Sequence, residues 1–288
     1  MNEAIKHMLY RYYRFLIRPL GRTGLVRHAF LHRLNRRLAA CFRPTSVVVD
    51  GHTMLLDDTD SLALTSGPYL PYTTRLITRL LQPGATAIDG GAHIGHFTLA
   101  FARAVGSTGR VHAFEPEPRN CSLLRKNIAL NGYENVIVVE RALSDAGGVA
   151  TLYCSDCSAL HRLHPSGMHS GTRTVETVRL DDCLNRDTPV DLVKLDIEGS
   201  EFAAFRGMTE CLRRNSGCKL VFEFCPTWLC EAGADPRELL VFLQAMGFRF
   251  FDIRESETKT QPVDATSLMA LYGRVAMSGT NVLALRDG

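Results

Sequence analysis

Two patterns of hydrophobic and polar residues, one typical of strands and one typical of helices, alternate several times along this chain after residue 83. Short apolar runs ending in a polar residue or glycine are followed by segments with apolar positions three and four residues apart. Strands and helices that alternate in this way form βαβ units, with a mostly parallel sheet covered by helices on both faces. We therefore predict an α/β fold with strands at 86–89, 110–115, 136–140, 192–196, 220–224, 248–254 and 281–286, and helices at 94–105, 119–131, 201–205 and 236–246.

Four predicted strands depart from the parallel pattern. No helix-length pattern separates residues 248–254 from 281–286, so we expect the terminal strand to be antiparallel, in a pair at the end of the sheet. Residues 150–153 and 174–179 are expected to form a second antiparallel pair, which flanks a polar loop.

The amino-terminal segment is strongly basic, and helices are expected at 4–20 and at about 24–42. Residues 1–43 hold ten Lys and Arg against one acid, a net charge of +9. Because the whole chain carries +3, the remainder sums to −6. A basic arm on an acidic body favours an anionic partner. Two interpretations stay open: a helix lying on an anionic membrane surface, or a helix packed on the main domain or a second subunit.

Length and composition fit one large soluble domain with this extension. The 288 residues are 45% hydrophobic and 22% charged. We place a basic helical extension at 1–45 and the main domain at 46–288, which opens with a hairpin around Asp50-Gly51 and a helix at 72–82. Without an 18-residue apolar run or a secretory leader, and with nine cysteines expected to be reduced, the sequence predicts a cytoplasmic protein, with 1–43 as a candidate peripheral membrane anchor.

The segment ATAIDGGAHIG joins a strand that ends in Asp89 to the next helix through a glycine-rich turn. Gly91 and Gly95 suit a close approach of the backbone to a ligand and tight packing of strand against helix. The spacing D-x-G-x-x-x-G differs from the G-x-G-x-x-G of dinucleotide sites, which place a pyrophosphate at the helix N-terminus. S-adenosylmethionine has no phosphate, and an acid at the strand end suits its ammonium group.

Glu115 ends the next strand in the sequence VHAFEP, where an acid can accept hydrogen bonds from both ribose hydroxyls of a nucleoside. The alternative is an acid that caps the helix starting after Pro116. Residues 140–144 follow the third strand, where small side chains such as Ala142 and backbone amides border an adenine ring. The alternative for this segment is an ordinary loop.

The segment DLVKLDIEGSE is a buried strand that ends in Asp196 and is followed by Glu198 and Glu201. Open α/β sheets bind ligands at the carboxyl ends of their strands. Methyl transfer from a sulfonium requires an aligned nucleophile and often removal of its proton, which a carboxylate can accept. Lys194 is expected to point away from this group. Alternatively, Glu198 and Glu201 are first-turn acids that interact with the helix dipole.

In order, the segments IDGGAHIGHFTLAFA, VHAFEPEPRNCSLLRKNIALNG, VRLDDCL, VDLVKLDIEGSE and VFEF resemble the FkbM-type methyltransferase family over about residues 46–254. The resemblance implies a class I methyltransferase fold, which is a Rossmann-like sheet, with S-adenosylmethionine as methyl donor. It also implies transfer to a hydroxyl, typically of a sugar or natural product. The active-site residues implied are Asp196 and Glu198. The cofactor-binding residues assigned are Asp89, Gly90, Gly91, Ala92, Gly95, Glu115, Pro116 and Ala142.

The loop at 154–173 lies outside this shared pattern, so the resemblance does not extend to the acceptor. The loop contains Cys154, Cys157, His161 and His164, whose types suit zinc but whose spacing is far shorter than in a zinc finger. We expect a polar loop that faces the substrate and no metal site, with His161 or His164 as an alternative general base.

The leading hypothesis is an enzyme that moves a methyl group from S-adenosylmethionine to a hydroxyl of a sugar, glycan, lipid or natural product. Glu223, at the end of the strand VFEF, either contacts this substrate or bonds to neighbouring backbone. One alternative is an RNA methyltransferase that uses residues 1–43 as a phosphate-binding arm, although the N/D-P-P-Y/F motif of amino-methylating enzymes is absent, which disfavours nucleic acid. The other is a non-catalytic S-adenosylmethionine-binding scaffold at a membrane, which retention of Asp196 and Glu198 disfavours.

Overall fold

The computed structural model describes residues 5, 6, 8–10, 12, 42–165, 169–273 and 278–286, which belong to two compact units, Met1–Tyr69 and Leu70–Gly288. The helices predicted at 4–20 and 24–42 lie almost entirely outside the described residues. The first unit contains the predicted hairpin, in which β1 (Ser46–Val49) pairs antiparallel with β2 (His52–Leu55). Asp50 and Gly51 between them have φ of 49° and 77°, as a two-residue type I′ turn requires. The boundary predicted at residue 45 stays a prediction.

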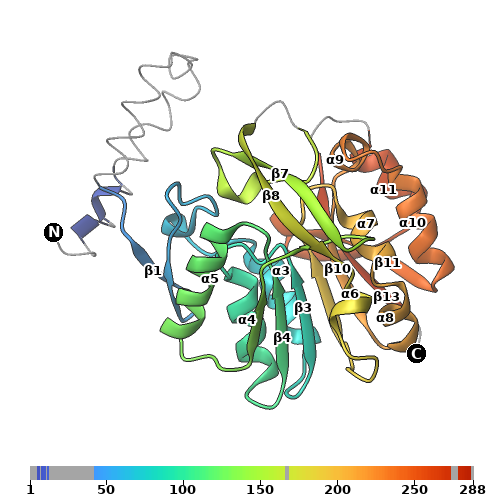
Figure 1. Ribbon diagram of the computed structural model, residues 1–288, viewed down its shortest axis with the longest axis horizontal. Coiled ribbons are helices and arrows are strands. Elements are labelled where there is room, and N and C mark those ends of the chain that lie inside the picture. The colour runs from blue at the N-terminus through green and yellow to red at the C-terminus, as the bar shows by residue number, and fades with distance from the viewer. Residues whose placement is uncertain are drawn as a thin grey trace. The chain divides into compact units, whose positions relative to one another are not determined.

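The second unit is built around a mostly parallel sheet whose strands are β3 (Thr86–Gly90), β4 (Arg110–Phe114), β5 (Val136–Val139), β9 (Leu192–Leu195), β10 (Lys219–Phe224), β11 (Phe248–Arg254), β12 (Lys259–Val263) and β13 (Thr280–Arg286). Their order across the sheet is β12-β11-β13-β10-β9-β3-β4-β5. Figure 1 shows β3 and β4 in one half of this sheet and β10, β11 and β13 in the other. Every pair from β5 to β10 is parallel, and β13 is antiparallel to β10 and β11. The predicted α/β fold is therefore confirmed.

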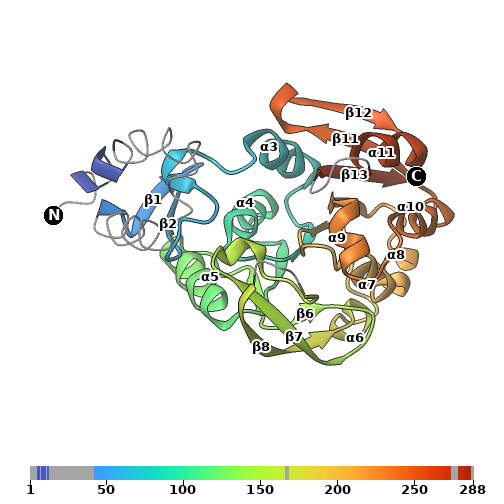
Figure 2. The same cartoon turned by 90° about the horizontal axis from the view of Figure 1, so that it is seen from above.

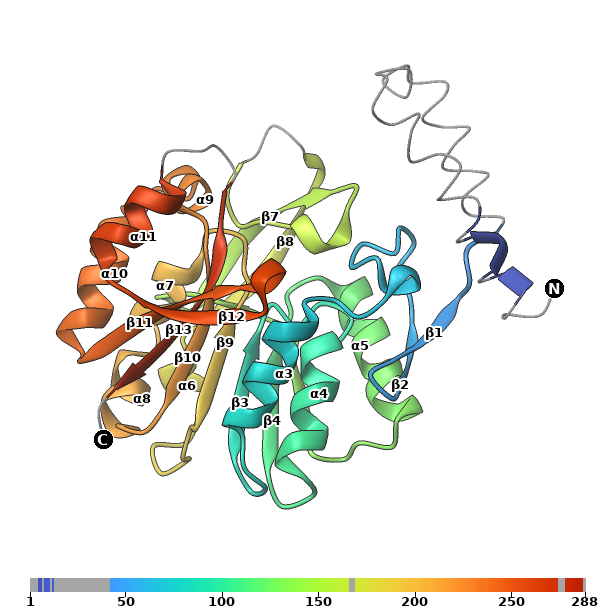
Figure 3. The same ribbon diagram turned by 180° about the vertical axis from the view of Figure 1, so that it is seen from behind.

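Helices cover both faces of this sheet. One face carries α3 (Pro71–Leu80), α4 (His96–Val105) and α5 (Pro118–Leu130), and the other α7 (Glu201–Arg206), α8 (Thr209–Arg214) and α10 (Pro236–Ala245) (Figures 2 and 3). Both α5 and α10 begin with proline after an acid, Glu117 or Asp235, whose side chain accepts a backbone N–H of the first turn. No helix among the described residues meets the length and apolarity needed to cross a membrane.

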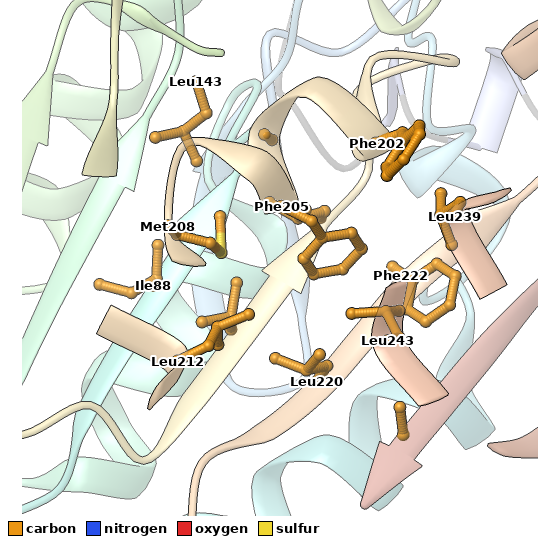
Figure 4. Close-up of a cluster of buried hydrophobic side chains, with 14 of the residues drawn as sticks. Ile88, Leu143, Phe202, Phe205, Met208, Leu212, Leu220, Phe222, Leu239 and Leu243 are labelled. Carbon is orange, nitrogen blue, oxygen red and sulfur yellow. The ribbon is translucent and has the colours of Figure 1, made fainter. Parts of the chain in front are cut away.

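The larger hydrophobic core fills the space between the sheet and α7, α8 and α10 (Figure 4). Ile88, Phe205 and Phe222 are fully buried there, and the two phenyl rings meet edge to face with centroids 5.3 Å apart. Burying a side chain of this size contributes about 1.5–3 kcal/mol. Because Ile88 points into this core, its neighbour Asp89 points to the opposite face, toward α4.

The region between β11 and β13 differs from the prediction. We expected no helix there, but the chain forms β12 and then α11 (Ala265–Tyr272). The sequence ATSLMALY is apolar almost throughout, so no amphipathic stripe reveals the helix. The terminal strand β13 is antiparallel as predicted. However, β12 forms the edge, so the β11–β13 pair does not end the sheet.

A smaller sheet emerges between β5 and β9. It consists of β6 (Ala142–Leu143), β7 (Gly148–Ser155) and β8 (His169–Val178), in the order β6-β8-β7. The predicted antiparallel pair is confirmed as β7 and β8, and the loop between them contains the short helix η3 (Ser158–Leu160). We call residues 154–165 the insert loop. The helices α6 (Leu180–Cys183) and α9 (Pro226–Glu231) complete the described elements.

Candidate active site

The turn between β3 and α4 is held against the ends of its neighbouring strands. The N–H groups of Gly91 and Ala92 both donate to Phe114 O, at 3.0 Å. A Cβ on Gly91, whose φ is 80°, would lie 1.9 Å from Asp196 O, and one on Gly95, at φ 101°, would lie 2.7 Å from a leucine of α5. Both glycines are thus required by packing within the protein, and their approach to a ligand stays a prediction.

Asp89 occupies the end of β3 as a fully buried acid. Its Oδ2 accepts the hydroxyl of Thr98 at 2.5 Å, whereas Oδ1 has no hydrogen-bond partner in the described part of the chain. Burial raises the pKa of Asp89. Gly90 faces the opposite side, where a Cβ would lie 2.6 Å from the Leu195 side chain. An unpaired carboxylate oxygen at this position fits an ammonium group, directly or through water.

Glu115 connects the two predicted cofactor loops. Its Oε2 accepts the His93 N–H at 2.9 Å, and its Oε1 accepts Glu117 N at 3.0 Å and Asn120 Nδ2 at 3.3 Å. The alternative that Glu115 caps the next helix is wrong, because the N-cap of α5 is Glu117. Burial raises the pKa of Glu115 to about 7. Its carboxylate retains lone-pair capacity beyond these three bonds, which fits a ribose hydroxyl.

A cavity of 550 Å³ lies beside Pro116, near the carboxyl ends of β4 and β5. This volume is within the range of small-molecule sites. Ala142 is buried in the two-residue strand β6, and Glu140 and Arg141 just before it line the cavity, so the role of residues 140–144 at the adenine stays a prediction. The lining residues are Pro116, Pro118, Val138, Val139, Glu140, Arg141, Thr174, Val175 and Glu176.

We call the glycine-rich turn between β3 and α4 the cofactor turn. Asp196 follows β9 and lies next to this turn, since its N–H donates to Gly90 O at 3.0 Å. Lys194 Nζ is 3.3 Å from Asp196 Oδ2 and 4.3 Å from the centroid of the Phe97 ring. The expectation that Lys194 points away is therefore wrong. Lys194 lies opposite Asp89 in the strand register and shares its face of the sheet, and a cation that is 1% exposed requires a carboxylate beside it.

Glu198 adopts a left-handed backbone conformation, with φ of 57°, which is uncommon for a residue other than glycine. The Nε2–H of His164 donates to Glu198 O at 2.9 Å. The carboxylate of Glu201 accepts the N–H groups of Ile197 and Gly199, each at 3.0 Å. Glu201 begins α7 and so fits the predicted first-turn acid, whereas Glu198 precedes the helix and is held in place from both sides.

Glu223 in β10 completes an acidic cluster with Asp196 and Glu198. Among the described residues, this is the one group of three or more potential metal ligands whose ligand atoms all lie within 4.8 Å of one another. Burial, then the charge of Asp196, raises the pKa of both glutamates well above the ordinary value. The question whether Glu223 contacts substrate stays open, but its Oε2 bonds no group in the described structure.

Arg162 is a site residue that the sequence analysis missed. Its side chain is 2% exposed, with Nη2 3.5 Å from Glu198 Oε2 and Nη1 3.2 Å from Glu231 Oε2. Its guanidinium lies 4.2 Å from the centroid of the Trp228 ring. A bridge between the backbones of Arg162 and Tyr153 folds the insert loop back toward the acids. An arginine in a polar loop has no sequence signal that separates it from a solvated one.

The insert loop also contacts the cofactor turn, where Ser158 Oγ and His93 Nε2 form a hydrogen bond of 2.7 Å. The two cysteines and two histidines considered for zinc do not form a cluster of ligand atoms within the described chain. His161 Nδ1 accepts the Ser155 N–H at 3.0 Å, and His164 bonds to Glu198 O as described above. Both imidazoles therefore hold backbone, which favours a structural role over that of general base.

Residues 89–250 match the family model described as the Methyltransferase FkbM domain. "Methyltransferase 1" of Beauveria bassiana is 29% identical over 146 residues, which are 43% of this chain and 58% of that protein. The tRNA (adenine(58)-N(1))-methyltransferase catalytic subunit TRM61 of Yarrowia lipolytica is 29% identical over 126 residues, 41% of this chain and 32% of that protein. The chain thus spans less than two thirds of either relative.

Among solved structures, a SAM-dependent O-methyltransferase from Thermotoga maritima is 19% identical, with a TM-score of 0.42, over 84% of this chain and 77% of that one. The family match covers more than half of this chain, from the Asp89 turn through the Asp196 loop and Glu223. The chain belongs to the FkbM methyltransferase family, and S-adenosylmethionine is the cofactor of its methyltransferase domain.

Proposed function

We propose that this protein transfers the methyl group of S-adenosylmethionine to a hydroxyl of a sugar, glycan, lipid or natural product. The observation that supports this most directly is the cluster of Asp196, Glu198 and Glu223 beside the cofactor turn. A hydroxyl becomes a strong nucleophile when its proton is removed, and buried acids with a raised pKa are suited to accept a proton near neutral pH.

The cofactor would be held at the carboxyl ends of β3 and β4. The unpaired Oδ1 of Asp89 fits its ammonium group, the carboxylate of Glu115 fits the ribose, and the cavity beside Pro116 fits the adenine. When bound, S-adenosylmethionine supplies an electrophilic methyl group on a sulfonium. The protein contributes alignment of the acceptor with that methyl group, since in-line displacement depends on orientation.

The acids would have different tasks in this mechanism. Lys194 holds Asp196 in one position, which suits orientation of the acceptor. The carboxylate of Glu198 is buried beside Asp196 and Glu223, and we assign it the role of accepting the hydroxyl proton. Arg162 favours the ionised form of Glu198 and so opposes the effect of burial on its pKa. A base that must be ionised gives activity that rises with pH.

The test is methyl transfer from labelled S-adenosylmethionine to a library of sugars, glycans, lipids and natural products. Glu198→Gln should lower turnover by about 10²–10⁴-fold, the usual contribution of a general base, and leave cofactor affinity unchanged. Glu210→Gln is the matched control, because Glu210 is exposed and forms a surface ion pair with Arg213. Full activity in Glu198→Gln would remove this residue from the reaction, and no transfer to any hydroxyl compound would refute the proposal.

The same experiment includes the RNA alternative, for which the named tRNA methyltransferase relative gives a reason. Labelled total RNA is added as an acceptor, with the full chain and with a chain lacking residues 1–43. Methyl transfer to RNA that requires the basic segment, without transfer to small hydroxyl compounds, would replace the proposal by an RNA-modifying function.

A further inference from the structure

We propose that Asp196, Glu198 and Glu223 bind one divalent cation of the Mg²⁺ or Mn²⁺ class beside the cofactor turn. This inference rests on the proposed function, because the cation would lie where the acceptor hydroxyl must bind. A cation there would orient the hydroxyl oxygen and favour transfer of its proton to the carboxylate of Glu198. It also revises the expectation from sequence that the protein has no metal site.

The geometry of the cluster suits one ion. The three carboxylates come from the carboxyl ends of the adjacent strands β9 and β10, and their ligand atoms lie within 4.8 Å of one another. Oxygens on opposite sides of one Mg²⁺ are about 4.2 Å apart, so small side-chain rotations would bring the three into its coordination shell. Carboxylate oxygens are the ligands that Mg²⁺ and Mn²⁺ prefer.

Independent evidence comes from oxygens that lack hydrogen-bond donors. The Oε2 of Glu223 is a buried atom without a hydrogen bond in the described structure, and the Oε2 of Glu198, which is 8% exposed, has the Arg162 ion pair at 3.5 Å but no hydrogen bond. Asn281 lies directly opposite Glu223 in the β10–β13 pair, and its Oδ1 is likewise buried and unbonded. Directly opposed residues share one face of a sheet. Two oxygens without hydrogen bonds beside an acid that has one distant ion pair leave lone pairs that a cation can accept.

The numbers of acidic and cationic side chains at the cluster also favour a bound cation. Both cations at the cluster already have carboxylate partners: Lys194 pairs with Asp196 at 3.3 Å, and Arg162 pairs with Glu198 at 3.5 Å. No described cation forms an ion pair with Glu223. Arg162 is further held by an exposed glutamate and the Trp228 ring, which suits a residue outside the coordination shell. The carboxyl groups of Asp196, Glu198, Glu201 and Glu223 therefore outnumber the cationic groups of Lys194 and Arg162 by two.

Titration calorimetry of the full chain with MgCl₂ and MnCl₂, against NaCl at matched ionic strength, measures this binding directly. We expect one site per chain and a higher Tm in the presence of the cation. Glu223→Gln should weaken binding by at least about tenfold, as loss of a supporting residue alone often does, and Glu210→Gln should not. Without divalent cations, Glu223→Gln should have a Tm equal to or above that of the wild type, because a neutral amide replaces a buried acid among other acids.

That last comparison separates loss of a ligand from loss of folding. Absence of a response to either cation in folded protein would overturn the proposal, and so would equal weakening by Glu223→Gln and Glu210→Gln. Methyl transfer to a hydroxyl that persists in EDTA, without calorimetric binding, refutes the cation site and leaves the proposed function in place. Calorimetric binding without transfer to any hydroxyl refutes the proposed function and leaves the cation site in place.

Discussion

Replacing Glu115 with glutamine tests whether one buried carboxylate joins the two cofactor loops. The carboxylate accepts hydrogen bonds from His93 N, Glu117 N and Asn120 Nδ2. Glutamine keeps one carbonyl oxygen, so its NH₂ group must face a backbone N–H on one side. A buried N–H without an acceptor costs about 1–3 kcal/mol, and at 5% exposure solvent does not replace the lost bond.

The loss of stability in Glu115→Gln should depend on pH. Burial raises the pKa of Glu115 from its ordinary 4.5 to about 7. Because the folded-state pKa is above the unfolded value, the group's contribution to stability is complete below about pH 4.5 and is lost as pH rises through about 7. A difference of about 2.5 in pKa corresponds to about 3 kcal/mol. Glutamine does not titrate. The free energy of unfolding that Glu115→Gln loses relative to the wild type should therefore be largest near pH 4.5, and this loss should disappear or reverse by pH 8.

Urea unfolding of wild type, Glu115→Gln and the exposed control Glu210→Gln at pH 5 and pH 8 measures the difference. The other buried acids titrate in all three proteins, so their contributions cancel in the comparison. Calorimetry at pH 8 should also show S-adenosylmethionine affinity reduced by about tenfold, equivalent to one hydrogen bond to a charged group. If the stability lost by Glu115→Gln is constant or grows with pH, Glu115 is not a buried acid with a raised pKa. Unchanged affinity would remove Glu115 from the cofactor site.

Other substitutions test the glycine turn, the insert loop and the basic arm. Gly91→Ala should lose cofactor binding or unfold, since its Cβ would meet a backbone oxygen at 1.9 Å; Gly132→Ala, also at positive φ but with no atom within 4 Å, should keep cofactor binding in the same thermal-shift titration. His164→Ala should cost about 1–3 kcal/mol in urea unfolding and lower kcat more than cofactor affinity, because Glu198 O loses its donor. If residues 1–43 bind anionic membranes, their deletion should abolish sedimentation with anionic vesicles and leave cofactor affinity unchanged.

The parts of the site that could be predicted from sequence are local in the chain. A strand that ends in an acid, a glycine turn and a helix form one continuous segment, so Asp89 and Gly91 are recognisable from spacing alone. The parallel order of βαβ units then brings the ends of β3, β4 and β9 to one edge of the sheet, together with Glu115 and Asp196. Local spacing and one rule of topology were sufficient for these residues.

The remaining site residues depend on contacts between distant segments. Glu223 and Asn281 meet because β13 enters the sheet between β10 and β11, and the missed helix α11 and strand β12 lie on the path to that position. Arg162 reaches Glu198 only because its backbone pairs with Tyr153 and its guanidinium packs on Trp228. None of these pairings has a period or spacing that a single sequence reveals.

The insert loop shows why residue type alone was misleading there. Histidine beside cysteine suits zinc, and histidine near a proposed acceptor site suits a base. In the structure, however, His164 bonds to the backbone of the loop that contains Glu198. A left-handed Glu198 persists only if neighbouring groups hold it, and in this structure His164 and Glu201 supply that support. The backbone of Glu198 is fixed in this way, and its side chain lies beside Asp196 and Glu223. The rigidity of the loop therefore links the supporting histidine to the chemistry of the acids, although the imidazole need not touch the acceptor.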